Sequence, residues 1–427
     1  MKVLILAAGR SQRAKPIEDK NFLSFCGKTL IERQLEELSK AGFKDFLVVG
    51  GAHNKEHLTK LLRPFKAKIF EQKNLNEGMA GAVLAVEKAV KNDDLFIVSG
   101  NDVVDQKAYE LMKKAAKETG DSFLLAYKVK GYFPGGYLKI KGNRINGICE
   151  KPEKGKEPST FINLVLHVHK NPKELFEALK KVSTARDDRY ECALDKLMKI
   201  RIFKPVKYEG FWQPVKYPWH VLDLQKHYLN TLKRKISPTA QIAKTAIIKG
   251  EVVIADGAKI FDHAVVQGPA YIGKNVVIGN NALVRESIIG DNSVVGFGSE
   301  IARSFIGEDC WFHTNYVGDS ILGENCSFGA GAVCANLRLD EKEIACGGVP
   351  SGRNKLGPIL GNNIRIGVQT SIMPGIKIGS NTQITSGLTI AEDISEGKFV
   401  YGETNLKIKE NKAILDKKTR EKMKGKL

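Results

Sequence analysis

The sequence of 427 residues lacks any apolar run long enough to cross a bilayer, since a membrane-spanning helix needs about 20 apolar residues. Its short N-terminal apolar run, residues 1–8, continues directly into Gly9 and Arg10 without a cleavage-like segment. We therefore predict a buried first strand and not a signal peptide. The seven cysteines are odd in number and form no C-x-x-C pair. This pattern argues against a disulfide framework or a zinc site and favours a reducing, cytoplasmic compartment without membrane attachment.

Acidic residues are scarce relative to basic ones, because 48 Asp and Glu stand against 67 Lys and Arg and give a net charge of +19. Such a charge favours anionic partners, which include nucleic acids and polyanionic small molecules. The sequence has no helix-turn-helix, RNP-type or zinc-finger pattern, so nucleic acid is the minor alternative. Part of the excess lies in residues 401–427, a basic C-terminal tail that is predicted to be a solvated helix or a disordered arm. Nucleic-acid binding through this tail stays an open alternative.

Residues 1–225 alternate short apolar runs with amphipathic helical stretches. Strands are predicted at residues 3–8, 46–51, 95–100 and 122–127, and helices at 29–42 and 108–120. This alternation predicts an α/β domain with a mostly parallel sheet that is covered on both faces. Ligands are then expected at the carboxyl ends of the strands. Residues 226–235 are predicted to form a linker helix.

Residues 236–400 follow a different pattern, in which aliphatic residues recur every six positions. The first nine are Ile236, Ile242, Ile248, Ile254, Ile260, Val266, Ile272, Ile278 and Val284. A six-residue period predicts a stacked parallel β-helix in which three hexads complete one coil. The handedness rule for parallel crossovers predicts right-handed coils. The segment resembles the hexapeptide-repeat proteins, however, and this resemblance implies a left-handed parallel β-helix.

The loop after the first predicted strand, LAAGRSQRAKPIEDK (residues 6–20), is glycine-containing and basic. A loop between a strand and a helix can direct backbone N–H groups at a phosphate. Gly9 allows a close approach of the backbone, and Arg13 and Lys20 can neutralise the charge of a triphosphate. The spacing matches neither the P-loop nor the G-x-G-x-x-G dinucleotide motif. We therefore predict a phosphate-binding loop of another kind.

The sequence LAAGRSQR, followed by Lys20 and GKTLIERQL, resembles the sugar-1-phosphate nucleotidyltransferases. The resemblance implies a Rossmann-like nucleotidyltransferase domain at residues 1–225. It also implies Asp102 as the Mg²⁺ ligand, with His220 and Asp223 as further metal candidates because His220 stands where the family often has aspartate. Another departure is Asn163-Leu164-Val165 in place of an Asn-Thr-Gly-like motif. The implied base contacts are Gln72 and Gly78, and the implied sugar contacts are Gly136, Glu150 and Asn163.

Residues 312–343 interrupt the hexads with polar side chains. Attack of an amine on a thioester needs a base, and an imidazole near neutral pH suits this task. His313 is the one histidine of the segment. The segment resembles the acetyltransferase site of bifunctional enzymes, which implies binding roles for Tyr316, Asn336 and Lys342. Residues 335–358 are predicted to form a loop that projects from the shaft. In related enzymes such a loop reaches a neighbouring subunit.

Both halves together resemble the bifunctional enzymes of UDP-N-acetylglucosamine synthesis, in their archaeal form. The resemblance implies that the chain acetylates glucosamine-1-phosphate with acetyl-CoA and then transfers a uridylyl group from UTP to the product. It also implies a homotrimer with acetyl-CoA in the groove between two subunits. Two alternatives stay open. The first is a glucose-1-phosphate uridylyl- or thymidylyltransferase whose β-helix is structural or differently specific. The second is a non-catalytic regulatory homologue.

Overall fold

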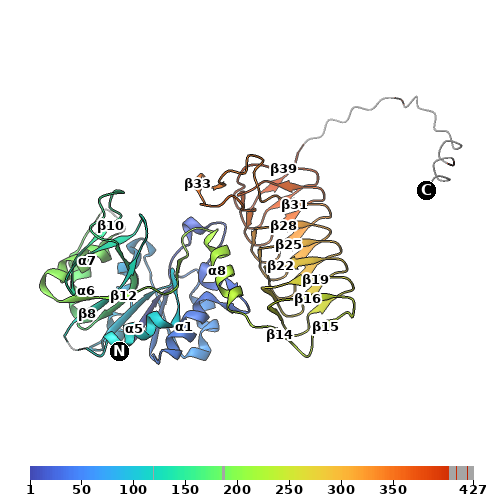
Figure 1. Cartoon of the computed structure of the whole chain (residues 1–427). Coiled ribbons are helices and arrows are strands. Elements are labelled where there is room, and N and C mark those ends of the chain that lie inside the picture. Colours follow the sequence, from blue (N-terminus) through green and yellow to red (C-terminus); the bar gives the residue numbers. More distant parts are fainter. Residues whose placement is uncertain (119, 185–187, 403–409, 411–420, 422–427) are drawn as a thin grey trace.

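The chain folds into two parts that are joined by one helix (Figure 1). The computed structural model describes all residues except 119, 185–187, 403–409, 411–420 and 422–427. An α/β part extends to residue 214, α8 (His220–Asn230) follows it, and a prism of short strands begins at residue 235. The expected basic tail lies almost entirely outside the described residues. Within those residues, no helix combines the length and the apolar character that a membrane span requires.

The α/β part is built on a nine-stranded sheet in the order β10-β9-β11-β6-β1-β4-β5, with β8 next to β11 and β12 next to β8. The strands are β1 (Lys2–Leu6), β4 (Phe46–Gly50), β5 (Lys68–Glu71), β6 (Leu95–Ser99), β8 (Ser122–Lys128), β9 (Gly136–Lys141), β10 (Arg144–Glu150), β11 (Phe161–His169) and β12 (Phe203–Tyr208). All four predicted strands are present. The predicted first strand, β1, is central and pairs in parallel with β4 and β6.

The prediction of a mostly parallel sheet is wrong for the half of the sheet beyond β6. β11 runs antiparallel to β6, β8 and β9, and β9 and β10 form an antiparallel hairpin. Only two residues, Gly142 and Asn143, connect β9 to β10, and Gly142 has a φ of 61°. A two-residue connection can join only antiparallel strands, and a positive φ is readily adopted by glycine. The sheet is therefore mixed.

Helices cover both faces of this sheet, as predicted. The helices are α1 (Leu30–Lys40), α2 (Lys55–Leu61), α3 (Gly78–Leu84), α4 (Glu87–Val90), α5 (Gln106–Ala115), α6 (Pro172–Lys181) and α7 (Arg189–Ile200). α1, α2 and α5 pack on the face to which Val3 and Ile5 point, and α3, α4, α6 and α7 pack on the face of Leu4. The N-cap of α1 is Thr29, whose side chain forms a reciprocal capping box with Glu32. This box satisfies two N–H groups that would otherwise lack acceptors.

The prism consists of three parallel sheets whose strands follow one another along the chain. The first sheet contains β14 (Lys235–Ile236), β17 (Val252–Ile254), β20 (Ala270–Ile272), β23 (Ile288–Ile289), β26 (Phe305–Ile306), β29 (Ile321–Leu322), β34 (Ile359–Leu360) and β37 (Lys377–Ile378). The second contains β15 (Gln241–Ile242), β18 (Lys259–Ile260), β21 (Val277–Ile278), β24 (Val294–Val295), β27 (Trp311–Phe312), β30 (Ser327–Phe328), β35 (Arg365–Ile366), β38 (Gln383–Ile384) and β40 (Phe399–Val400). The third contains β16 (Ile247–Lys249), β19 (Val265–Gln267), β22 (Leu283–Arg285), β25 (Glu300–Ala302), β28 (Tyr316–Gly318), β31 (Val333–Cys334), β36 (Ser371–Ile372) and β39 (Thr389–Ile390).

The hexad pattern therefore produces the predicted parallel β-helix, and the stacked coils are consistent with the left-handed form. Ile236 pairs with Ile254, 18 residues later, which is three hexads. Ile272 pairs with Ile289, 17 residues later, so one residue is lost in this coil and the register of the hexads shifts. From Ile254 onward the six remaining aliphatic side chains of this series are buried in the shaft, whereas Ile236 in the first coil is exposed. Burial of each such side chain contributes roughly 1.5–3 kcal/mol relative to exposure.

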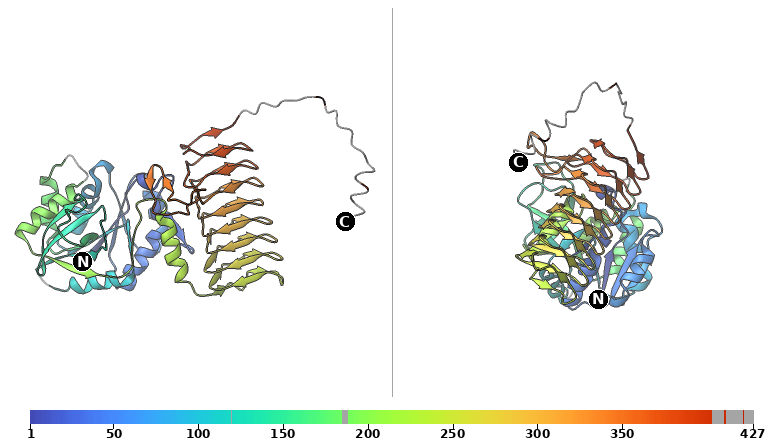
Figure 2. Two further views of the ribbon diagram at one scale, coloured as in Figure 1. Left: turned by 45° about the horizontal axis from the view of Figure 1, so that its top comes forward. Right: turned by 90° about the vertical axis from the view of Figure 1, so that its right-hand side faces the viewer.

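Residues 335–358 interrupt the coils and project from the shaft, as predicted, between β31 and β34. They contain the antiparallel hairpin of β32 (Ala345–Cys346) and β33 (Val349–Pro350). The orange hairpin in Figure 2 lies next to α8 of the same chain. The guanidinium of Arg353 forms an ion pair with Asp223 of α8. This insertion is therefore a bridge from the prism back to the α/β part.

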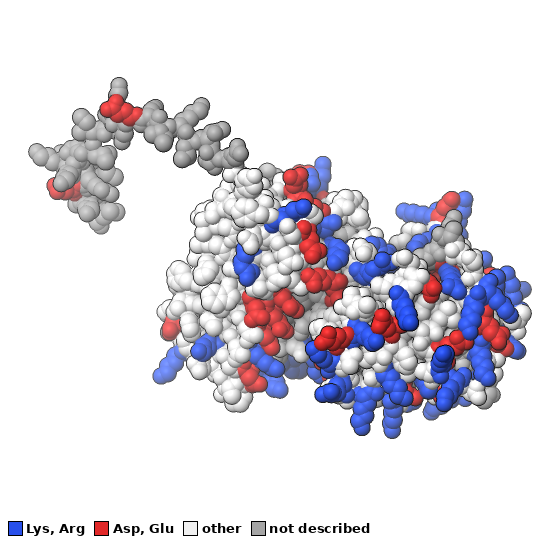
Figure 3. Space-filling view, turned by 180° about the vertical axis from the view of Figure 1, so that it is seen from behind, with Lys and Arg blue, Asp and Glu red and all other residues white. Residues whose placement is uncertain are grey.

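An apolar cluster also joins the two parts. Phe25 from the α/β part lies against Phe305 of the prism, with ring centroids 5.1 Å apart, and Tyr271 belongs to the same buried cluster. The Gln225 side chain donates a hydrogen bond to the Glu286 carbonyl at 3.0 Å. Figure 3 shows Lys and Arg side chains spread over the α/β part, while Asp and Glu gather on the neighbouring strip of the prism. The excess of basic groups thus lies mainly on the part that is predicted to bind phosphates.

Candidate active sites

A cavity of about 540 Å³ opens where β1 and β6 end, next to β9, β10 and β11. It brings together nine predicted nucleotidyltransferase residues from distant parts of the chain: Gly9, Arg13, Lys20, Gln72, Gly78, Asp102, Gly136, Glu150 and Asn163. The position at the carboxyl ends of parallel strands matches the expectation for α/β sheets. A side chain at Gly9 would meet no protein atom within 4 Å, so this glycine leaves open space for a ligand.

Lys20 is a buried cation at the end of the basic loop. Its ammonium donates a hydrogen bond to the Val215 carbonyl at 3.2 Å. Burial and the neighbouring Arg13 lower the pKa of Lys20 to about 8, while Asp102 and Asp19 act in the opposite direction. A partly desolvated ammonium next to a guanidinium is poised to bind an anion, because an incoming phosphate relieves both effects.

The sequence analysis missed the side chains that hold this loop in place. The amide nitrogens of Asn21 and Asn54 both donate to the Ala7 carbonyl, at 3.1 and 2.9 Å. The same amides donate to the Asp19 carboxylate, each at 2.7 Å. Asn54 follows β4, so only folding brings it to this loop. These bonds tie the end of β1 to residues 19–21 and thereby place Lys20 in the cavity.

Asp102 begins the short strand β7 (Asp102–Val104), which pairs with β13 (Trp212–Pro214). Its carboxylate accepts a hydrogen bond from the Trp212 indole at 3.0 Å. Burial raises the pKa of Asp102, and the Trp212 hydrogen bond and the Lys216 and Lys20 charges oppose this rise. Among the described residues no group of three His, Cys, Asp or Glu side chains could hold a metal. The Asp102 carboxylate is a hard oxygen donor, and Mg²⁺ is often held by one or two carboxylates together with substrate phosphates, so this side chain fits a magnesium ligand.

The two further metal candidates do not lie with Asp102. Neither His220 nor Asp223 lines the cavity. Nδ1 of His220 accepts a hydrogen bond from the Lys216 backbone N–H at 3.2 Å, and burial lowers the pKa of His220 to about 4. Asp223 is paired with Arg353. His220 therefore fixes the backbone that precedes α8, and Asp223 anchors the insertion of the prism to α8.

The opposite end of the cavity holds the predicted sugar contacts. Gly136 pairs with Glu150 across the β9–β10 hairpin, and a Cβ at Gly136 would lie 2.9 Å from the Glu150 carboxylate. A larger residue at position 136 would therefore displace Glu150. Asn163 lies on β11, and its side-chain oxygen is 2.8 Å from Nε2 of His167.

A buried chain of hydrogen bonds orients Asn163. His167 Nδ1 is 2.8 Å from the Tyr190 hydroxyl, which is 3.1 Å from Nε2 of His169. Burial keeps both rings neutral, since it lowers the pKa of His167 well below the usual value and that of His169 to about 3. The Asn163 oxygen can only accept, so His167 Nε2–H donates to it, His167 Nδ1 accepts from Tyr190, and His169 donates to Tyr190. The Asn163 amide nitrogen then stays available as a donor to a ligand.

We expect His167→Leu to raise KM for the sugar 1-phosphate about fivefold, because a fixed donor is lost at a cost of about 1 kcal/mol. Initial rates of pyrophosphate release measure this effect. Tyr190→Phe should act in the same direction with less loss, since it removes the hydroxyl and retains the ring. Thiol release from acetyl-CoA should not change in either variant. An unchanged KM in both folded variants would show that the chain does not position Asn163.

The second candidate site lies on the prism. Asn336 Nδ2 donates to the Tyr316 hydroxyl at 3.3 Å and also bonds to the Asp319 carboxylate. Asp319 forms a bidentate pair with Arg303, with both distances 2.7 Å. The structure thus brings Tyr316 and Asn336 together, and it adds two residues that sequence reasoning had not assigned.

His313 follows β27 at a corner of the prism and is exposed. Its ring centroid lies 6.2 Å from that of Trp311. Lys342 is also exposed, on the projecting insertion. In the described part of the chain, no hydrogen bond or ion pair links either side chain to Tyr316 or Asn336. The site is therefore open to solvent on a single chain.

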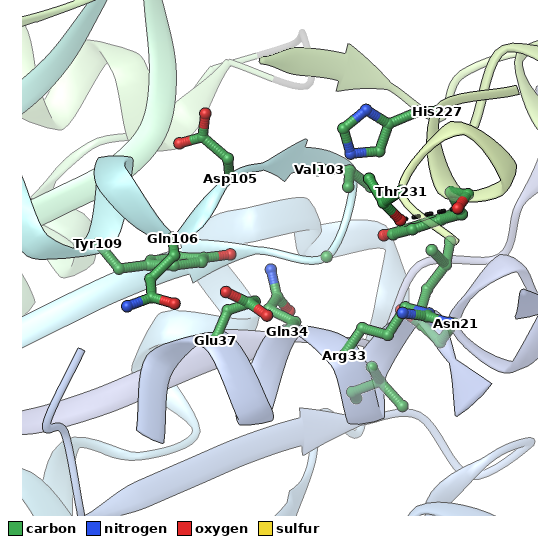
Figure 4. Close-up of a pocket in the computed structure, with 14 residues that line it drawn as sticks. Asn21, Arg33, Gln34, Glu37, Val103, Asp105, Gln106, Tyr109, His227 and Thr231 are labelled. Carbon is green, nitrogen blue, oxygen red and sulfur yellow. Dashed lines mark hydrogen bonds between the residues drawn. The ribbon is translucent and has the colours of Figure 1, made fainter. Parts of the chain in front are cut away.

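A further cavity of about 380 Å³ lies between α1, α5 and α8 (Figure 4). It is lined by Val103, which points to the other side of β7 from Asp102, since successive strand residues face opposite sides. The Arg33 guanidinium at its edge donates to the Phe25 carbonyl and lies 4.4 Å from the centre of the Tyr228 ring. The acidic side chains of Glu37 and Asp105 also line it. With two carboxylates beside one guanidinium, this cavity suits a phosphate less well than the cavity that contains Arg13 and Lys20.

The α/β fold with a basic strand-end loop, joined to a hexad β-helix, defines a two-domain transferase with a nucleotidyltransferase domain. Residues 3–237 match the MobA-like NTP transferase domain model, and residues 232–344 match the GMPPB C-terminal domain model. The bifunctional sugar-1-phosphate nucleotidylyltransferase/acetyltransferase of Sulfurisphaera tokodaii is 33% identical, over 93% of this chain and 99% of its own. The bifunctional protein GlmU of Methanocaldococcus jannaschii is 32% identical, over 94% and 97%. The chain belongs to this family of bifunctional nucleotidyltransferases and acetyltransferases.

Among solved structures, a UDP-glucose pyrophosphorylase in complex with UDP-glucose aligns with 54% of this chain and 98% of its own. The two are 18% identical, and the TM-score is 0.48.

Proposed function

We propose that the chain acetylates glucosamine-1-phosphate with acetyl-CoA and then transfers a uridylyl group from UTP to N-acetylglucosamine-1-phosphate. The observation that carries this proposal is the convergence of Gly9, Arg13, Lys20 and Asp102 in one cavity with the sugar-end residues Gly136, Glu150 and Asn163. The similarity to the bifunctional sugar-1-phosphate nucleotidylyltransferase/acetyltransferase of Sulfurisphaera tokodaii supports two activities on a phosphorylated sugar.

In uridylyl transfer, a phosphate oxygen of the sugar 1-phosphate attacks the α-phosphorus of UTP, and pyrophosphate leaves. Arg13 and Lys20 bind the phosphates of the nucleotide, and Gln72 and Gly78 bind its base. Asp102 would hold Mg²⁺, which would supply neutralisation of charge on the phosphates when bound. The cavity also positions the attacking oxygen in line with the α-phosphorus and the leaving pyrophosphate. Such positioning supplies much of the rate enhancement in phosphoryl-type transfer.

In acetyl transfer, the amino group of the sugar attacks the thioester carbon, the C–N bond forms, and the C–S bond breaks to release coenzyme A. His313 removes the amine proton as the C–N bond forms. Tyr316 and Asn336 orient the amine and the thioester oxygen, and Lys342 pairs with the sugar phosphate. Asp319 and Arg303 hold Asn336 in place.

A homotrimer completes the second site in this proposal. The edge of the prism near His313 carries exposed Phe297 and Trp311, at 61% and 50% of their full accessibility. Large exposed apolar side chains are typical of surfaces that other subunits cover. Acetyl-CoA would then lie in the groove between two subunits. All seven cysteines are free, which accords with a reducing cytoplasmic location.

A panel assay tests the substrates of both halves. Pyrophosphate release is measured with UTP and TTP against glucose-1-phosphate, glucosamine-1-phosphate and N-acetylglucosamine-1-phosphate, and thiol release is measured with acetyl-CoA and the amino-sugar phosphates. We expect the highest kcat/KM with UTP and N-acetylglucosamine-1-phosphate, and thiol release with glucosamine-1-phosphate. A preference for glucose-1-phosphate without thiol release would favour the first alternative. Absence of both activities would favour the regulatory homologue.

A further inference from the structure

Lys216 is a further cation of the nucleotidyltransferase cavity, and neither the sequence motifs nor the comparisons assign it a role. It lies two residues after β13 and lines the cavity together with Asp102. Its ammonium lies 4.4 Å from the centre of the Phe133 ring and donates to the Pro134 carbonyl at 3.4 Å. Among the described residues it forms no salt bridge within 4 Å, although its charge is within electrostatic reach of Asp102 and Glu150. The cation therefore retains capacity to bind an anion.

The backbone around Lys216 is held firmly. The Val215 N–H donates to the Asn101 carbonyl at 2.8 Å, and the Val215 carbonyl accepts from the buried ammonium of Lys20. The Lys216 N–H donates to His220. Burial keeps His220 neutral and therefore able to accept this bond. The histidine that replaces an expected aspartate thus positions Lys216.

The place of Lys216 in the cavity indicates which anion it binds. Asp102, Arg13 and Lys20 mark the end that binds the nucleotide phosphates, and Glu150 marks the end that binds the sugar. Lys216 follows β13, which pairs with the strand of Asp102, and its ammonium lies against Phe133 and Pro134 just before Gly136 at the sugar end, so it lies between these ends. The phosphate of the sugar must occupy the same place, since one of its oxygens has to reach the α-phosphorus. Directly across from Asp102 in the β7–β13 pair is Pro214, which has no group that could hold a cation there.

We propose that Lys216 is a catalytic residue that binds the phosphate of the attacking sugar 1-phosphate and supplies positive charge opposite Asp102. This inference rests on the proposed uridylyl transfer. The ammonium orients the nucleophilic phosphate, and it offsets the repulsion between that phosphate and the nucleotide. Asp102 is the one carboxylate assigned to Mg²⁺ in the proposed site, so the negative charge of the two phosphate groups is only partly offset there. A fixed lysine is chemically suited to offset the remaining charge.

Binding of the acceptor without metal tests the proposal. Titration calorimetry in EDTA compares N-acetylglucosamine-1-phosphate with N-acetylglucosamine for the full chain, Lys216→Met and Lys216→Arg. Lys216→Met removes the ammonium but retains an unbranched side chain of similar length, and Lys226→Gln on the exposed side of α8 is the matched control. We expect Lys216→Met to bind the phosphorylated sugar about 10- to 100-fold more weakly, the usual effect of losing a charge-assisted hydrogen bond. Binding of the unphosphorylated sugar should not change, and Lys216→Arg should retain most of the affinity.

Steady-state rates provide the second readout. KM for the sugar 1-phosphate should rise in Lys216→Met, while KM for UTP and the rate of thiol release stay near the values of the full chain. Unchanged binding in Lys216→Met would overturn the proposal. Equal loss of UTP and sugar-phosphate affinity would also overturn it, because Lys216 would then serve the nucleotide. If the unaltered chain bound the sugar phosphate but released no pyrophosphate with any nucleotide, the proposed function would fail while the calorimetry still decided the role of Lys216.

Discussion

Asp102→Asn is expected to reduce pyrophosphate release by on the order of a thousandfold, because loss of the carboxylate that we propose to hold the metal would remove several kcal/mol of charge stabilisation from the transition state. Asparagine retains an oxygen that can accept the Trp212 hydrogen bond, so the fold should be preserved. Thiol release takes place on the other part of the chain and should therefore remain intact. Initial rates of both reactions on the same preparation measure these effects.

Asp105→Asn is the matched control for this experiment. Asp105 lies three residues further on and lines the other cavity, between α1, α5 and α8. Its replacement removes a similar charge nearby and should leave most of the uridylyl transfer. Retention of full pyrophosphate release in Asp102→Asn would exclude Asp102 as the metal ligand. Loss of both activities in a folded variant would contradict two separate sites.

His313→Ala is expected to slow acetyl transfer by about 10²–10⁴-fold, the usual contribution of a general base. Pyrophosphate release with N-acetylglucosamine-1-phosphate should be unaffected, since this substrate already carries the acetyl group. The side chain is exposed, so the free energy of unfolding should change by less than about 0.5 kcal/mol. Release of coenzyme A, followed by a thiol reagent, measures the rate.

His263→Asn provides the control for His313→Ala. His263 is another exposed histidine at a corner of the prism, and its φ of 59° is one that asparagine adopts readily. Its replacement should leave thiol release unchanged. Equal rates in His313→Ala and the unaltered chain would assign the base to another group, and Tyr316 would be the next side chain to replace.

Regular patterns of the sequence were sufficient for the two domain types, although not for the strand directions beyond β6. Aliphatic residues at a spacing of six predict the β-helix because each coil repeats the same local geometry, and the one-residue shift after Val284 appears in the structure as a shorter coil. The apolar runs of the α/β part predict four strands of its nine-stranded sheet, because buried strands read as short continuous apolar runs. The antiparallel hairpin at Gly142 carries a local signal as well, a glycine and an asparagine between two strands, which would have predicted a mixed sheet.

Several features of the sites have no local signal. His167 and Tyr190 are 23 residues apart and meet only because α7 packs on the sheet next to β11. Asp223 and Arg353 are 130 residues apart and meet because the insertion of the prism folds back onto α8. Lys216 acquires its place from β13, which pairs with the strand of Asp102.

The sequence by itself therefore determined the two domain types, the basic loop after the first strand, and the pairing of a nucleotidyltransferase with a β-helix, since each depends on residues that are close along the chain. Tertiary structure alone decided which cations surround Asp102, how Asn163 is oriented, and that His220 and Asp223 serve the backbone and the domain bridge. The physical reason is that hydrogen bonds and charge interactions act over a few ångströms in space. Only packing determines which distant residues come within that range.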